Sequence, residues 1–171
     1  MAEDKGLQAM NVTLDATEVA VAQGLATMRY TVARMAKVKN QRVGSQSDYI
    51  TDLEGMAGEL AFCKLRNLFP DLTIGPRKGG WDVLSPGGEG IDVKVTHREE
   101  GRLLATLKKR LEDADYYVLM IGKCPDYRFA GYATAEALLR EENIMNLPHG
   151  RCYALDQDKL KGLGHDTTTN R

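Results

Sequence analysis

The sequence has no long apolar run, few cysteines and no motif of a secreted protein. No stretch approaches the roughly 18 apolar residues that a membrane span requires, so we expect no contact with a membrane. The polar start of the chain lacks the basic flank and apolar stretch of a secretory signal, which predicts a cytoplasmic location. The three cysteines form neither a CxxC pair nor a disulfide framework, and we expect reduced core residues at Cys63, Cys124 and Cys152.

Histidine and excess charge are also scarce. The three histidines are dispersed and none lies at a ligand spacing from a cysteine, which argues against structural zinc. A net charge of -1 argues against a long electrostatic footprint on nucleic acid, so any phosphate contact must be local. For each basic cluster taken alone, a solvated surface is the commoner explanation. The clusters are Lys37, Lys39 and Arg42; Arg77 and Lys78; Arg98 and Arg102; and Lys108, Lys109 and Arg110.

The length predicts one domain. A chain of 171 residues with 43% hydrophobic content can build one substantial core, so we assign residues 1–171 to a single domain. Residues 1–13 and 165–171 are polar and without periodicity, and we expect both ends to be flexible.

Two amphipathic helices are predicted in the first half of the chain. Apolar residues recur at three and four over residues 15–39, where Asp15 and Glu18 resemble a capping box. A second helix is expected over 48–69, ended by Pro70. A capping box of Thr51 and Glu54 would start this helix three residues later.

The second half has the pattern of a mixed α/β fold around one central sheet. The residues of 101–113 and 134–142 are expected to form helices, and those of 156–163 a final helical turn. Short β-like runs are separated by Gly and Pro clusters, at 72–74, 81–84, 91–96, 116–121, 128–132 and 151–155.

The most informative segment is a predicted hairpin over residues 79–96. Two β-like runs flank a turn of Ser, Pro and Gly, and a turn centred near Gly87 or Gly88 sets Asp82 opposite Asp92. Since strand residues two apart share a face, Lys94 joins Asp92 there. Their strand neighbours point to the opposite, buried side; these are Ile91, Val93 and Val95.

Two carboxylates and one ammonium on one patch predict a metal site. Adjacent carboxylates repel, and a divalent cation offsets that repulsion. Mg²⁺ prefers one or two carboxylates and keeps waters for substrate phosphates. Beside it, Lys94 is placed to orient the attacking water and stabilise developing charge. The alternative is an ordinary cross-strand ion-pair cluster of Asp82, Asp92 and Lys94 on a solvated face.

A third acid, Glu59, lies in the second predicted helix between unusual neighbours. Gly55 and Gly58 each lower helix stability by about 1 kcal/mol, so some other contact must favour them. Their lack of bulk lets this side of the helix approach a sheet or a phosphate closely. The alternative is a tight packing contact with Glu59 at its solvent edge.

A helix bearing Glu59, a strand bearing Asp82 and a strand bearing Asp92-x-Lys94 together resemble the PD-(D/E)xK nuclease superfamily. The similarity spans residues 55–132, with 152–155 and Leu160 similar to the closing strand and turn of some members. The resemblance implies a restriction-endonuclease-like αβββαβ core, a central mixed sheet flanked by helices, here with an extra long N-terminal helix. It further implies that the three acids bind Mg²⁺ (or Mn²⁺) and that the lysine acts on the water.

The sequence departs from the family pattern at two positions. Trp81 replaces the proline before the first strand acid, and the acid of the D-x-K motif is Asp92 rather than the commoner Glu. In the family, the helix after this motif often carries a further polar site residue, for which Lys108 or Lys109 is a candidate. Weaker candidates for nucleic-acid contact are Arg77, Lys78, His97, Arg98, Lys108 and Lys109.

The function expected from this resemblance is a Mg²⁺-dependent deoxyribonuclease with DNA as its partner. Its small size suggests a phage or mobile-element nuclease, acting in the host cytoplasm if phage-encoded, and the long first helix offers a homodimer interface. One alternative is a non-catalytic module that binds nucleic acid or protein on a nuclease-like fold. Another is a structural cluster in a different α/β enzyme, although the chain has no GxxxxGK loop, nucleophile elbow or GxGxxG fingerprint.

Overall fold

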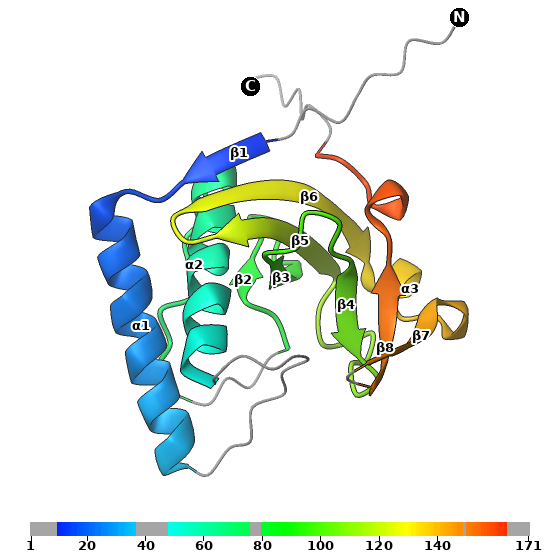
Figure 1. Ribbon diagram of the computed structural model, residues 1–171, viewed down its shortest axis with the longest axis horizontal. Helices are drawn as coiled ribbons and strands as arrows, with labels where there is room; N and C mark the ends of the chain where they lie inside the picture. Colours follow the sequence, from blue (N-terminus) through cyan, green and yellow to red (C-terminus); the bar gives the residue numbers. More distant parts are fainter. Residues whose placement is uncertain (1–9, 37–47, 76–79, 149, 164–171) are drawn as a thin grey trace, which may run out of the picture.

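The computed structural model describes residues 10–36, 48–75, 80–148 and 150–163 (Figure 1). Their helices are α1 (Ala16–Met35), α2 (Asp48–Arg66) and α3 (Ala135–Leu138), with 3-10 turns at Glu141–Asn143 and Gln157–Lys159. The strands are β1 (Met10–Thr13), β2 (Val83–Leu84), β3 (Gly90–Thr96), β4 (Leu103–Thr106), β5 (Tyr116–Lys123), β6 (Asp126–Thr134), β7 (Ile144–Leu147) and β8 (Gly150–Leu155).

The strands form two sheets. The larger is mixed, in the order β1-β6-β5-β3-β2, and within it β3 and β5 are parallel while the other neighbours are antiparallel. The smaller sheet is antiparallel, in the order β4-β8-β7. The predicted α/β class with a mixed sheet and flanking helices is therefore confirmed, whereas the second sheet was not expected.

The larger sheet carries an apolar core on each face. Helices α1 and α2 lie side by side along one face (Figure 1), where Met56 of α2 packs in the same cluster as Val93 of β3. The smaller sheet covers the other face, where its Leu103 packs in the same cluster as Tyr117 and Leu119 of β5. Because strand residues alternate between faces, Asp92 and Lys94 point away from the helices.

Helix α1 begins as its sequence predicts. The Asp15 carboxylate accepts a hydrogen bond from the Glu18 amide at 2.9 Å, and the Glu18 carboxylate accepts one from the Asp15 amide at 2.7 Å. This reciprocal pair satisfies amide groups that the first helical turn leaves without partners. The prediction that the helix runs on to residue 39 falls partly outside the described residues, in which α1 ends at Met35. The predicted break at Gly44 and Ser45 also lies outside them.

The end of α2 is set by Asn67, not by Pro70 as predicted. Asn67 adopts the left-handed conformation, with φ 52°, which closes the helix. The amide of Leu68 then donates to the carbonyl of Cys63 at 2.9 Å. The helix begins at Asp48, so the alternative start at Thr51 is wrong.

Gly58 of α2 is required by close packing on β3. A Cβ at Gly58 would lie 2.2 Å from Cγ2 of Val95, whereas a Cβ at Gly55 would meet nothing within 4 Å. Gly58 therefore explains the tight helix contact that the sequence left as an alternative. Glu59, however, is buried at 9% exposure and does not lie at a solvent edge.

Replacing Gly58 by alanine is expected to destabilise the fold by about 1–2 kcal/mol, because overpacking outweighs the gain in helix propensity. The midpoint of thermal unfolding would fall by roughly 2–8 °C for a domain of this size. Gly55→Ala is the matched control, and we expect it to raise stability by about 0.5–1 kcal/mol. A stabilised Gly58→Ala protein would contradict this packing.

The predicted hairpin is confirmed, with the predicted register. Val83 pairs with Ile91 and Leu84 with Gly90 in an antiparallel ladder. The Asp82 amide continues this ladder by donating to the Ile91 carbonyl at 2.8 Å, although the regular strand is confined to Val83–Leu84.

The helix predicted over 101–113 is wrong, because this segment forms β4 followed by turns. Leu103 and Ala105 alternate into the core of the second sheet, and β4 pairs with β8. The leucines that completed the apparent helical stripe, Leu107 and Leu111, are exposed. Pairing across the sheet thus overrode the local periodicity.

Three further predictions need correction. Residues 72–74 form no strand, and residues 10–13, expected to be flexible, form the edge strand β1, which pairs with β6. Strand β7 was not predicted. The expected helix over 134–142 is divided into α3, capped by Thr134, and a 3-10 turn. Residues 1–9 and 165–171 lie outside the described residues.

Candidate functional site

Asp82 and Asp92 lie next to each other at the open end of the hairpin. Oδ2 of Asp82 accepts a hydrogen bond of 2.7 Å from the amide of Val93, which directly follows Asp92. Because β2 begins only at Val83, the Val93 amide donates to the Asp82 carboxylate in place of a backbone carbonyl.

Asp92 is a buried carboxylate held between two lysines. It is 2% exposed, and its side chain points from β3 toward the second sheet. Oδ1 lies 2.6 Å from Nζ of Lys94, and Oδ2 lies 2.8 Å from Nζ of Lys109. A buried charge requires such compensation, since desolvation disfavours an unpaired carboxylate.

Lys109 reaches Asp92 from the loop that follows β4. Its ammonium also donates to the carbonyl of Gly80 at 2.8 Å and lies 5.9 Å from the ring centroid of Tyr117. Gly80 allows this approach, because a Cβ there would lie 2.8 Å from the backbone oxygen of Asp113. The loop and the start of the hairpin are therefore joined through Lys109.

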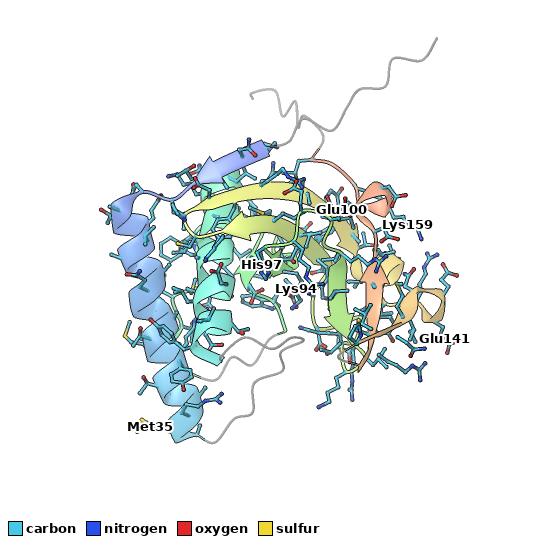
Figure 2. The ribbon with its side chains drawn as sticks, in the orientation of Figure 1. Met35, Lys94, His97, Glu100, Glu141 and Lys159 are labelled. Carbon is cyan, nitrogen blue, oxygen red and sulfur yellow. The ribbon has the colours of Figure 1, made fainter. Side chains whose placement is uncertain are left out.

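Lys94 lies on the same strand face as Asp92 but is more open, with 34% of its side chain exposed. Burial acts to lower the pKa of Lys94, yet the negative charges of Asp92, Asp82 and Glu59 outweigh it and raise the pKa above its ordinary value. All three acids are thus close enough to Lys94 for their fields to act on it. In the view of Figure 2, Lys94 and His97 are seen between α2 and β4.

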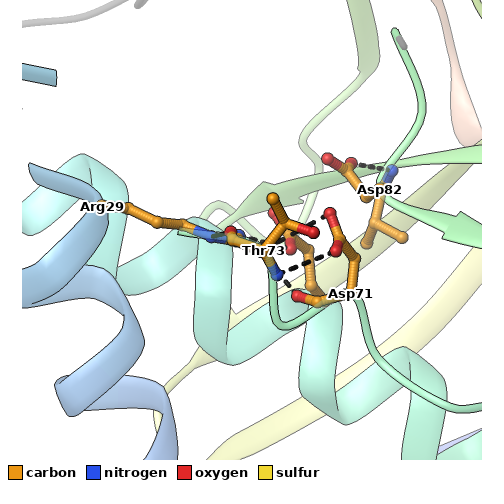
Figure 3. A network of polar contacts seen from close by, with 6 residues as sticks. Arg29, Asp71, Thr73 and Asp82 are labelled. Atoms are coloured by element: carbon orange, nitrogen blue, oxygen red, sulfur yellow. Dashed lines mark hydrogen bonds and ion pairs between the residues drawn. The ribbon is translucent and has the colours of Figure 1, made fainter. Parts of the chain in front are cut away.

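Glu59 is paired with an arginine of α1. Nη1 of Arg29 lies 3.0 Å from Oε2 of Glu59, and both side chains are largely buried. The same guanidinium donates to the carbonyls of Asp71 and Thr73, at 2.6 and 3.1 Å. Figure 3 shows Arg29 reaching from α1 to this segment, with Asp82 in the same region. These contacts account for the extended but unpaired form of residues 71–74.

The pKa of the Cys63 thiol is affected by negative charge on the helical side of the site. Burial, followed by the charges of Glu59 and Asp82, raises the pKa of Cys63 to about 12. Cys63 belongs to the core between the helices and the sheet. The negative charges of Glu59 and Asp82 therefore act on the core between the helices and the sheet.

The charges of the site are balanced by the protein itself. Among the described residues, Arg29 pairs with Glu59 and lies 3.9 Å from an oxygen of Asp71. Lys94 and Lys109 both pair with Asp92. The repulsion between Asp82 and Asp92, from which a metal was expected, is thus already offset by lysine.

The donor set fits a divalent cation at two of the three acids. Oδ1 of Asp92 is buried, and its partner among the described residues is the ammonium of Lys94 at 2.6 Å. With the adjacent Asp82, it offers the one or two carboxylates that Mg²⁺ prefers. Glu59 is engaged with Arg29. Among the described residues, no three His, Cys, Asp or Glu side chains are grouped as metal ligands.

The weaker candidates for phosphate contact are scattered. His97 and Arg98 are exposed directly after β3, where they are followed by Glu99 and Glu100. Lys108 is exposed, in contrast to its neighbour Lys109. Arg77 and Lys78 lie outside the described residues.

Two residues of the site escaped sequence reasoning. Arg29 sits among apolar residues of a long helix, and no spacing links it to Glu59, 30 positions away. Lys109 was only a weak candidate, because the run Lys108-Lys109-Arg110 does not indicate which member points inward. A carboxylate as buried as Asp92 requires a partner, but only the fold identifies it.

Comparison of the chain with protein-family models, with curated proteins and with solved structures finds no match in any of the three. Within the described ranges, no helix has the length and apolar character to cross a membrane.

Proposed function

We propose that the chain is a Mg²⁺-dependent (or Mn²⁺-dependent) phosphodiesterase of the PD-(D/E)xK type that cleaves DNA. One observation carries this proposal: the Asp82 carboxylate reaches across the hairpin to the amide next to Asp92, and Lys94 pairs with Asp92 from the same face of β3. Two carboxylates and an amine in this arrangement are what metal-assisted hydrolysis of a phosphodiester requires.

The surrounding fold supports the same assignment. Helix α2 packs on β3, β3 pairs antiparallel with β2, and β5 runs parallel to β3. This helix, hairpin and parallel strand correspond to the central part of the nuclease core implied by the sequence. The connection from β3 to β5 departs from it, because it contains β4 in place of a helix.

Each residue has a role that follows from its contacts. When bound, the divalent ion would supply Lewis-acid chemistry and an activated water, with Asp82 and Asp92 as its holders. Lys94, partly exposed, is placed to contact a phosphate oxygen and to stabilise charge that develops there. Lys109 orients the Asp92 carboxylate, and Glu59 contributes negative charge from the helical side.

A non-catalytic module that binds nucleic acid or protein is the second candidate. The two lysines that pair with Asp92 favour it, because Asp92 then needs no metal to be stable in the core. Under this alternative, the cluster holds the hairpin, the β4 loop and α2 together, and Lys94 serves only as an ion-pair partner.

Cleavage of DNA tests the proposal directly. Purified protein would be incubated with linear duplex, branched and single-stranded DNA in the presence of Mg²⁺ or Mn²⁺, with chelator in parallel. We expect metal-dependent cleavage of at least one form, abolished by chelator. If no form is cleaved with either metal, the binding module is the better account. Parallel incubation with RNA of the same sequence shows whether the protein distinguishes DNA from RNA.

A further inference from the structure

The two lysines on Asp92 are held to very different degrees. Lys109 is fixed by the Asp92 carboxylate, the Gly80 carbonyl and the face of Tyr117. Lys94 makes its ion pair with Oδ1 of Asp92 and has a third of its side chain exposed. A lysine with a flexible four-carbon stem and an exposed head can swing into solvent, whereas one with three buried contacts cannot.

The Lys94 ammonium stands where a cation bound to Asp92 would have to approach. It occupies the Oδ1 side, where its Nζ lies 2.6 Å from that oxygen. The opposite oxygen, Oδ2, is covered by Lys109 at 2.8 Å.

We propose that Lys94 competes with the divalent cation for Asp92 and withdraws from Oδ1 when the cation binds, which frees its ammonium for the substrate phosphate. This inference rests on the metal site of the proposed function. Lys94 thus acts as a gate: its ammonium stays paired with the Asp92 carboxylate until a metal ion binds there and displaces it.

The gate has a distinct thermodynamic signature. An ammonium and a divalent ion on the same carboxylate oxygen repel strongly at a separation of a few ångströms. Part of the free energy of metal binding is therefore spent on displacing Lys94. A protein without that ammonium should bind the metal more tightly. If the lysine instead assisted metal binding, its removal would weaken the affinity for metal.

Calorimetric titration of Mn²⁺ into the intact protein tests the gate without measuring cleavage. We expect Lys94→Met to bind Mn²⁺ at least about fivefold more tightly than wild type, since one competing charge is removed. Lys94→Arg keeps the charge and should remain within about twofold of wild type. Lys123→Met, which removes an exposed charge at the far end of β5, is the matched control with the same limit.

Equal or weaker Mn²⁺ binding by Lys94→Met than by wild type overturns the gate. An equally large gain in Mn²⁺ affinity by Lys109→Met also overturns it, because the two lysines would then be equivalent.

Parallel cleavage assays separate the two proposals. If wild type cleaves DNA while Lys94→Met gains no affinity, the gate fails and the nuclease stands. If Lys94→Met gains affinity but wild type never cleaves, the gate stands and the nuclease fails. If neither protein binds Mn²⁺, both fail.

Discussion

Lys94→Met is expected to reduce metal-dependent DNA cleavage by about 10³-fold, the range lost when a group that stabilises transition-state charge is removed. Methionine retains the length of the side chain but not its charge. Single-turnover cleavage of labelled DNA at saturating Mn²⁺ measures this loss, because tight metal binding by the variant then cannot mask it. The affinity for metal and the rate of cleavage should thus move in opposite directions.

Lys123→Met controls for the loss of one positive charge and should cleave within about twofold of wild type, because long-range charge effects are screened by salt. Cleavage by Lys94→Met at the wild-type rate would show that another group serves the reaction, with Lys109 as the nearest amine.

Asp92→Asn is expected to have the largest effect on stability, with a loss of about 2–3 kcal/mol in the free energy of unfolding. Asparagine keeps the shape of the side chain, but it leaves two ammonium groups without their counter-charge at a site that is 2% exposed. Partial exposure of Lys94 moderates the loss. Thermal unfolding should show a midpoint roughly 4–12 °C lower and no stabilisation by Mn²⁺.

Asp156→Asn provides the matched control. Asp156 pairs with Arg102, but both side chains are well exposed, and such surface pairs contribute little. We expect a change within about 0.5 kcal/mol. If Asp92→Asn were as mild as Asp156→Asn, the buried ion-pair cluster would not be the anchor that its geometry indicates.

The hairpin was predictable because its signals are local. The Ser-Pro-Gly-Gly turn fixes the register, and strict alternation around Asp92 and Lys94 assigns each side chain to a face. The capping box of α1 is local in the same way, since Asp15 and Glu18 are three positions apart. Where neighbouring residues decide the structure, the sequence was sufficient.

The segment 101–113 shows why other parts were not predictable. Its leucines fit a helical period as well as an alternating one, and the choice was made by β8, whose partner strand lies some 50 residues away. A sheet pairing over that distance leaves no trace in a local window. Lys109 was therefore a weak candidate for a site residue on a helix, whereas the loop after β4 carries it to Asp92.

The ion pairs made by Arg29 and Lys109 were not predictable for the same reason, because their partners lie far away in the sequence. The sequence predicted that Glu59, Asp82 and Asp92 would gather, and the negative charges of all three raise the pKa of Lys94. It did not predict that Arg29 would engage Glu59, or that two lysines would share Asp92. The long first helix thus contributes a site residue.

Anomalous diffraction from a crystal soaked in Mn²⁺ is the most direct test of the central claim, that Asp82 and Asp92 hold a cation beside Lys94. The account predicts one strong peak bonded to both aspartates, with Nζ of Lys94 moved away from Oδ1 and the pair of Arg29 and Glu59 intact. Absence of a peak between the aspartates at millimolar Mn²⁺, with Lys94 still on Asp92, would contradict it.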